Sequence, residues 1–98
     1  MKTIILVIAF TGYQPVEYGE PKRILTEKGF AVLTASDALG EATAKDGTTT
    51  LVDIVIADIT PESGDAVYVV GGPGALDHLD TATMYTILQT WAASGKPY

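Results

Sequence analysis

The sequence contains no cysteine among its 98 residues, which excludes a disulfide framework and a cysteine-ligated metal site within this segment. Histidine occurs once, as His78, so a site built from several histidines is excluded as well. Basic residues are few: 6 Lys and Arg stand against 12 Asp and Glu, which gives a net charge of −6. They are scattered, so they form no stripe that follows a phosphate backbone. We predict no nucleic-acid partner, no metal and no cofactor.

Long hydrophobic runs are also lacking, and none approaches the roughly 20 apolar residues that a membrane-spanning helix needs. Met1-Lys2 and the apolar stretch 3–10 resemble the start of a secretion signal, but the run is short and no small-residue cleavage pattern follows it. We therefore expect a soluble, cytoplasmic protein without a membrane partner. With 47% hydrophobic and 18% charged residues, the chain can build a packed core and makes at most one small domain.

The apolar runs that are present predict strands of a parallel sheet. Residues 4–10 and 66–70 are continuous apolar runs, rich in β-branched residues and without polar alternation, which is typical of strands covered by helices on both faces. Three more extended stretches are expected: 30–35, a short edge strand or hairpin at 41–47, and 48–59, which bends near Asp53.

Two stretches favour helices. The first covers residues 15–28 and is closed by Gly29; because Pro21 lies inside it, this helix either kinks or restarts at the proline. The second covers residues 81–94. The order strand, helix, strand, strand, helix predicts an α/β fold with right-handed βαβ units and an open, mostly parallel sheet.

The second helix also predicts that the sheet is incomplete within this sequence. It is capped by Asp80 or Thr81, and it carries one apolar stripe at helical spacing, formed by Met84, Ile87, Leu88 and Trp91. Residues 96–98 then read as the lead-in to a further strand, which the sequence does not contain. We therefore expect a half-covered stripe and a strand left as an open edge.

Several short motifs occur in a specific order along the chain. Glu17 stands four residues before Pro21, in the helix after the first strand. The strand starting at 65–67, the Gly-Gly-Pro-Gly turn at 71–74 and Ser-Gly-Lys-Pro at 94–97 follow. In this order and spacing the sequence resembles the ThiJ/PfpI superfamily over essentially its whole length. That group includes intracellular cysteine peptidases, glyoxalase III-type enzymes and the parkinsonism-associated deglycase.

The resemblance implies a flavodoxin-like open parallel sheet with helices on both faces. In this superfamily the stretch after Gly-Lys-Pro continues into a strand and a sharp turn that bears a nucleophilic cysteine, which would fall beyond Tyr98. Residues 1–98 are thus expected to be the amino-terminal part of a single domain, inactive alone and completed by a complementary carboxy-terminal chain. The completed protein would be a homodimeric, cysteine-dependent hydrolase, glyoxalase or deglycase-like enzyme acting on a small carbonyl or amide substrate. The alternative is a non-enzymatic, redox-sensing or chaperone-like dimeric member of the same superfamily.

Glu17 is the first candidate catalytic residue. The resemblance implies that its carboxyl group hydrogen-bonds the cysteine sulfur, where it could donate or shuttle a proton. Its place near the carboxyl end of the first strand agrees with this role, because open α/β sheets bind ligands at that edge. The alternative is a first-turn glutamate that complements the helix dipole.

The glycine turn supplies the other candidates. Gly71 and Gly72 follow a buried strand, and glycine permits a positive φ and a close backbone approach. The resemblance implies that Gly72 is catalytic, its N–H stabilising an oxyanion, and that Gly71, Pro73 and Gly74 contact the substrate. The alternative is an ordinary strand-to-helix turn. A dinucleotide site is disfavoured, because the glycines lack the required spacing and do not follow the first strand.

Three further positions bear on function. The resemblance places the catalytic histidine directly after the cysteine, so we interpret His78 as a partly exposed loop or interface residue. Val70 stands where the superfamily often has proline. Leu76 occupies the region where the peptidase branch has a glutamate that acts across a subunit interface, and this difference argues against a typical peptidase.

Overall fold

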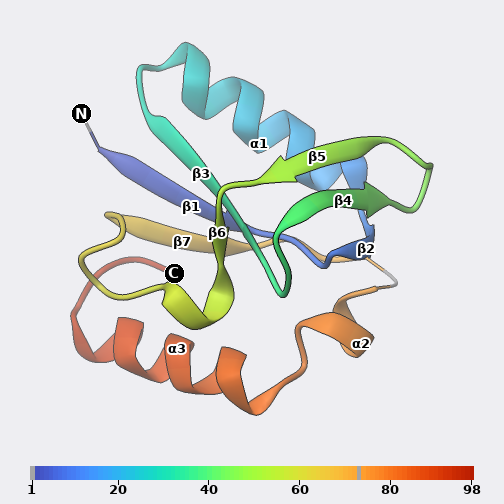
Figure 1. Ribbon diagram of the computed structural model, residues 1–98. Coiled ribbons are helices and arrows are strands. Elements are labelled where there is room, and N and C mark those ends of the chain that lie inside the picture. Colours follow the sequence, from blue (N-terminus) through green and yellow to red (C-terminus); the bar gives the residue numbers. More distant parts are fainter. Residues whose placement is uncertain (1, 73) are drawn as a thin grey trace.

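The computed structural model describes residues 2–72 and 74–98, and its larger sheet confirms the predicted open parallel arrangement (Figure 1). The sheet has the order β6-β3-β1-β7, and its described strand pairs are all parallel. Its members are β1 (Thr3–Val7), β3 (Ala31–Ser36), β6 (Ile54–Val55) and β7 (Ala66–Val69). Because the strands are parallel, their carboxyl ends meet at one edge of the sheet.

β1 is an interior strand of this sheet, between β3 and β7, and its predicted burial is confirmed. Ile5, Leu6 and Val7 are buried, and so is Ile8 just after the strand, which agrees with an apolar run covered on both faces. The predicted strand 4–10 is nevertheless too long, since β1 ends at Val7 and the chain then crosses to a second sheet.

The second sheet is small and lies beside the carboxyl edge of the first (Figure 1). It contains β2 (Thr11–Tyr13), β4 (Gly40–Ala44) and β5 (Thr49–Val52), in the order β2-β4-β5. β4 and β5 form an antiparallel hairpin, so residues 41–47 supply one strand and the turn of a hairpin that is longer than the one expected there, and β4 is not an edge strand of its sheet.

The predicted bend at Asp53 is confirmed, and it joins the two sheets. Asp53 lies between β5 and β6, where its backbone N–H donates to the Thr34 carbonyl and its Oδ2 accepts the Thr34 N–H, both at 2.8 Å. The expectation of extended structure to residue 59 is wrong, because η1 (Ile56–Asp58) is a 3-10 helix. Ile56 and Ile59 are both buried, and their spacing of three matches the 3-10 repeat, which places them on one side.

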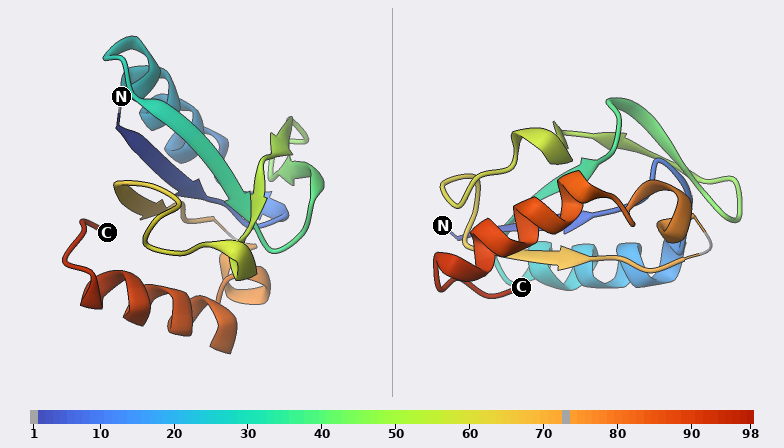
Figure 2. Two further views of the ribbon diagram at one scale, coloured as in Figure 1. Left: turned by 60° about the vertical axis from the view of Figure 1, so that its left-hand side comes forward. Right: turned by 90° about the horizontal axis from the view of Figure 1, so that it is seen from below.

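Helix α1 (Pro15–Glu27) covers one face of the larger sheet (Figure 2). Its cap is Gln14, whose side chain accepts the Val16 N–H, and Gly29 follows it with φ +88°. The helix continues through Pro21, so the alternative that it restarts there is wrong. Pro21 has no N–H to donate to the carbonyl of Glu17, one turn earlier.

Helices α2 (Ala75–His78) and α3 (Ala82–Ala93) follow β7, and α3 lies on the sheet face opposite α1 (Figure 2). Thr81 is the cap of α3, accepting the Met84 N–H at 3.1 Å. The expectation of a half-covered apolar stripe is wrong for Met84 and Trp91, which are 2% and 0% exposed. The reason is that η1 packs against α3 and supplies part of the missing cover.

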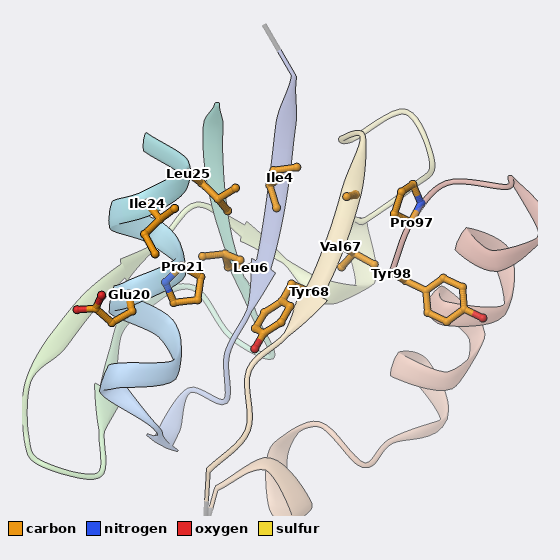
Figure 3. A pocket seen from close by; sticks show the side chains of 11 residues that line it. Ile4, Leu6, Glu20, Pro21, Ile24, Leu25, Val67, Tyr68, Pro97 and Tyr98 are labelled. Carbon is orange, nitrogen blue, oxygen red and sulfur yellow. The ribbon is translucent and has the colours of Figure 1, made fainter. Parts of the chain in front are cut away.

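The uncovered apolar surface lies on the α1 side instead. A groove of about 530 Å³ runs between α1 and strands β1 and β7, and it is lined almost wholly by apolar side chains (Figure 3). The lining residues are Ile4, Leu6, Glu20, Pro21, Ile24, Leu25, Ala66, Val67, Tyr68, Pro97 and Tyr98. Among the described residues, β7 is the edge strand on this side, and Tyr68 and Val69 are exposed.

Residues 97 and 98 return to this edge. The Val67 N–H donates to the Pro97 carbonyl at 3.1 Å, and Trp91 Nε1–H donates to the same oxygen at 2.7 Å. The end of the chain therefore begins to pair beside β7, as the predicted lead-in to a further strand requires. Within the part of the chain that the structure describes, no helix has the length and apolar character needed to cross a membrane.

Candidate functional site

Two loops meet at the carboxyl edge of the larger sheet, and backbone hydrogen bonds join them. The Gln14 N–H, just before α1, donates to the Gly71 carbonyl at 3.0 Å. The Gly74 N–H donates to the Gly12 carbonyl at 3.1 Å. The turn after β7 is thus attached to the segment that leads into α1, and the first turn of that helix lies beside it.

Glu17 points to this junction from the first turn of α1. A Cβ added to Gly71 would lie 3.0 Å from Glu17 Oε2, so the carboxylate directly adjoins the glycine turn. Glu17 is exposed, and its carboxylate has no hydrogen-bond partner among residues 2–72 and 74–98. The predicted placement of Glu17 and the glycine pair on the same edge is confirmed, whereas their catalytic roles stay predictions.

Gly72 occupies a conformation that requires glycine. Its φ is +136°, and a Cβ there would lie 2.6 Å from the Gln14 nitrogen and 2.8 Å from the Gly12 oxygen. Both neighbours are backbone atoms, so they cannot give way as a side chain would. Within the described chain no acceptor is found for the Gly72 N–H, which leaves this donor available at the edge of the sheet.

Of the two remaining predicted substrate contacts, Gly74 and Pro73, only Gly74 lies among the described residues. Gly74 is buried, and a Cβ at this position would overlap the Thr11 carbonyl oxygen, so its role in the fold is a close backbone approach. Pro73 lies outside the described residues. Among the side chains that the structure describes, no group of three metal-ligating residues comes together.

A pair that the sequence interpretation missed lies near the same edge. His78 Nδ1 lies 2.7 Å from Asp37 Oδ2, with the two side chains 31% and 29% exposed. His78 is partly exposed, as predicted, but it ends helix α2 and does not lie in a loop. Its partner Asp37 directly follows β3, and that position at the carboxyl end of a parallel strand is the signal that could have drawn attention to it.

Asp37 has further partners that fix it in place. Its Oδ1 accepts the Phe10 N–H at 2.9 Å and the Ser36 hydroxyl at 3.1 Å. Partial burial acts to raise the pKa of the Asp37 carboxyl, but the hydrogen bonds from His78 and from the backbone outweigh it and lower the pKa below its usual value. The pair borders a cavity of about 330 Å³ between η1 and the start of α3.

Sequence comparisons connect the whole chain with one family. A family model described as the DJ-1/PfpI family matches residues 2–98. An uncharacterized protein of Staphylococcus aureus is 34% identical over 84 aligned residues, covering 83% of this chain and 48% of the relative. A protein of Pyrococcus abyssi that is named a deglycase is 34% identical over 68 residues, covering 69% of this chain and 41% of the relative. The chain therefore spans about half the length of the curated relatives it matches.

Solved structures show the same fold. A ThiJ/PfpI domain protein from Brachyspira murdochii matches with a TM-score of 0.90 and 26% identity, over 96% of this chain and 54% of that one. Oxidized DJ-1 from Toxoplasma gondii matches with a TM-score of 0.83, over 98% of this chain and 53% of that one. At 24% identity the second match concerns the fold alone.

Proposed function

We propose that this chain, which belongs to the DJ-1/PfpI family, provides Glu17 and Gly72 to the active site of a cysteine-dependent enzyme whose nucleophilic thiol lies outside the sequence. The observation that carries this proposal is the junction at the sheet edge. The exposed Glu17 carboxylate, which has no hydrogen-bond partner among the described residues, adjoins Gly71. The next residue, Gly72, has a backbone N–H without an acceptor in the described chain, where two parallel strands end. Open α/β sheets bind their ligands at this edge.

The chemistry proposed is attack on a small carbonyl or amide substrate. The thiolate sulfur forms a bond to the carbonyl carbon, and the electron pair of the C=O bond moves to the oxygen. The Gly72 N–H would donate to that oxyanion, because a fixed donor stabilises charge that develops during the reaction. Glu17 would hydrogen-bond the sulfur and, in a hydrolase, pass a proton to the leaving group as the oxyanion collapses and the bond from the carbonyl carbon to that group breaks; water then cleaves the thioester and restores the thiol. Glyoxalase and deglycase-like reactions share the attack on the carbonyl and the oxyanion, and the name of the Pyrococcus abyssi relative supports the deglycase-like reaction.

The thiol would be supplied by the segment or chain that completes the domain. We propose that a strand continuing from Tyr98 pairs with β7, because the Val67 N–H already bonds the Pro97 carbonyl. A following helix would cover the apolar groove beside α1. A sharp turn at the carboxyl end of that new strand would place a cysteine at the same edge as Glu17 and Gly72. The completed protein is proposed to be a cytoplasmic homodimer. Sedimentation analysis of the full protein would test its dimeric state.

The test uses protein purified from its natural source or as the full chain. Mass spectrometry after labelling with iodoacetamide identifies the thiol-bearing segment, and the rate of labelling is then measured across pH. We expect Glu17→Gln to change the pH dependence of this rate, because an amide still donates a hydrogen bond but cannot exchange its proton with the thiol.

Glu27→Gln is the matched control. Glu27 is an exposed glutamate at the end of the same helix, where it pairs with Arg23 at 3.2 Å and lies outside the lining of the apolar groove. It should leave the labelling profile unchanged. Equal profiles for Glu17→Gln and the unmodified protein would remove Glu17 from the mechanism. A single folded, monomeric species with the mass of these 98 residues alone would refute the proposed completion.

A second candidate is a non-enzymatic member that senses oxidants or acts as a chaperone-like dimer. The solved structure of DJ-1 from Toxoplasma gondii is of the oxidized protein, which supports this candidate, since a sensor needs an accessible thiolate that oxidises reversibly. The two candidates differ in turnover. An enzyme converts many carbonyl substrate molecules per thiol, whereas a sensor consumes one equivalent of peroxide per thiol and recovers with a reductant.

A further inference from the structure

Helix α2 is too short to hold its own position. It contains four residues, Ala75–His78, and a single helical turn is not stable in isolation, because helix nucleation is unfavourable. It begins directly after the glycine turn, where the Ala75 N–H donates to the Gly72 carbonyl at 3.1 Å and the His78 N–H donates to the Gly74 carbonyl at 3.0 Å. The direction of the Gly72 peptide therefore depends on what holds α2.

Helix α2 is held by apolar packing of Ala75 and the buried Leu79, and by one polar contact from the side chain of His78. Among the described side chains of residues 71–80, His78 is the only one that hydrogen-bonds another element, through its 2.7 Å contact with Asp37. Asp37 is itself fixed by the Phe10 N–H and by the Ser36 hydroxyl. The contact is about two-thirds shielded from solvent, so it is less weakened by water than an exposed ion pair.

We propose that the Asp37–His78 pair is the positioning device of the glycine turn, a role that rests on the proposed function of Gly72. The path runs from the carboxyl ends of β1 and β3 through Asp37 to His78, and through α2 to the Gly72 peptide. His78 thus acts on the oxyanion donor through the backbone and does not touch the substrate. Removing either partner leaves the turn attached by the Gln14 and Gly74 backbone bonds and by the buried Leu79 beyond α2, with no side-chain hydrogen bond between α2 and another element among the described side chains.

The experiment measures amide hydrogen exchange by NMR in the full chain. The reporting amides are those of Gly74 and Ala75, which are hydrogen-bonded within or beside the turn. We expect His78→Ala and Asp37→Ala each to raise their exchange at least about fivefold, as loss of one hydrogen bond of ordinary strength should do. The double variant should exchange no faster than Asp37→Ala alone, because Asp37→Ala already removes the contact that His78→Ala removes. Asp37→Asn keeps an oxygen acceptor and should restore part of the protection.

Asp46→Asn is the matched control. Asp46 also accepts a backbone N–H and a hydroxyl, both from Thr48, but it does so in the turn between β4 and β5. It should leave the exchange of Gly74 and Ala75 unchanged. Unchanged exchange in His78→Ala, additive effects in the double variant, or an equal rise in the core amides of β1 would each overturn the positioning role.

Turnover separates this inference from the proposed function. If the His78 and Asp37 variants exchange the turn amides faster, with a lowered kcat and an unaltered KM, both the positioning role and the oxyanion role of Gly72 are supported. Faster exchange of the turn amides with an unaltered kcat still supports the positioning role, but it refutes the assignment of Gly72 as the oxyanion donor.

Discussion

Replacing Gly72 by alanine tests whether the glycine turn is as constrained as its geometry indicates. The φ of +136° is a conformation that a residue with a Cβ rarely adopts, and holding such a residue there costs roughly 1–3 kcal/mol. The added Cβ would also lie 2.6 Å from the Gln14 nitrogen. Overpacking of this kind against a well-packed neighbour costs roughly another 1–3 kcal/mol.

The expected loss for Gly72→Ala is therefore about 2–6 kcal/mol in the free energy of unfolding. Most of that range is smaller than the roughly 5–15 kcal/mol by which domains are usually stable, so we expect a folded but destabilised protein. The assay is urea unfolding of the full chain, followed by the fluorescence of Trp91, which is fully buried. An unchanged slope with a lower midpoint would show that stability alone has changed.

Gly19→Ala provides a control of opposite sign. Gly19 lies inside α1, and a Cβ there would meet nothing within 4 Å. Alanine should stabilise the helix by roughly 0.5–1 kcal/mol, because glycine is a poor helix former. If Gly72→Ala were as stable as the unmodified protein while Gly19→Ala behaved as expected, the turn would not be constrained by its backbone neighbours. The argument for a fixed oxyanion donor would then fail.

Two further predictions concern side chains near the sheet. Because the pKa of Asp37 is lowered in the folded state, its contribution to stability is present above the ordinary carboxyl pKa and is lost as pH falls through the lowered value. In Asp37→Asn the free energy of unfolding, measured by circular dichroism, should therefore fall less steeply between about pH 5 and pH 2. Tyr18→Phe should cost roughly 1–2 kcal/mol in urea unfolding, because it leaves the buried Thr34 hydroxyl, 2.7 Å from the tyrosine oxygen, without that partner; a cost near zero would mean that water replaces the bond.

Local sequence signals predicted the strands and long helices because each is decided within a few neighbouring residues. The apolar run of β1 and the Thr81 cap are such cases, and both are confirmed. The bend at Asp53 was predicted too, although its physical basis is a pair of hydrogen bonds to Thr34. The position of Glu17 at the carboxyl edge of the sheet was also predicted, because that prediction requires only that a helix follows the first strand.

Features that depend on distant segments could not be predicted. His78 and Asp37 are 41 positions apart, and their contact arises only when the end of β3 and helix α2 are placed in space. The cover of Met84 and Trp91 in α3 was misjudged for the same reason, because nothing local indicates that Ile56 turns into a 3-10 helix beneath them; Ile87 and Leu88 are half-buried, as expected. The open strand edge was also expected, and β7 forms it among the described residues, but the apolar groove beside α1 was not.

The positions of these contacts divide the proposed active site into two independent parts. The glycine turn is held by Gln14, Gly12 and the Asp37–His78 pair, all within the present chain, so the proposed oxyanion donor is set before any thiol is added. The thiol would instead be placed by a strand that pairs with the β7 edge. Changes to the turn should therefore lower turnover without altering thiol reactivity, whereas changes at Glu17 should alter thiol reactivity first. If variants of the turn and variants of Glu17 both changed turnover and thiol reactivity together, the division of the site into two parts would be refuted.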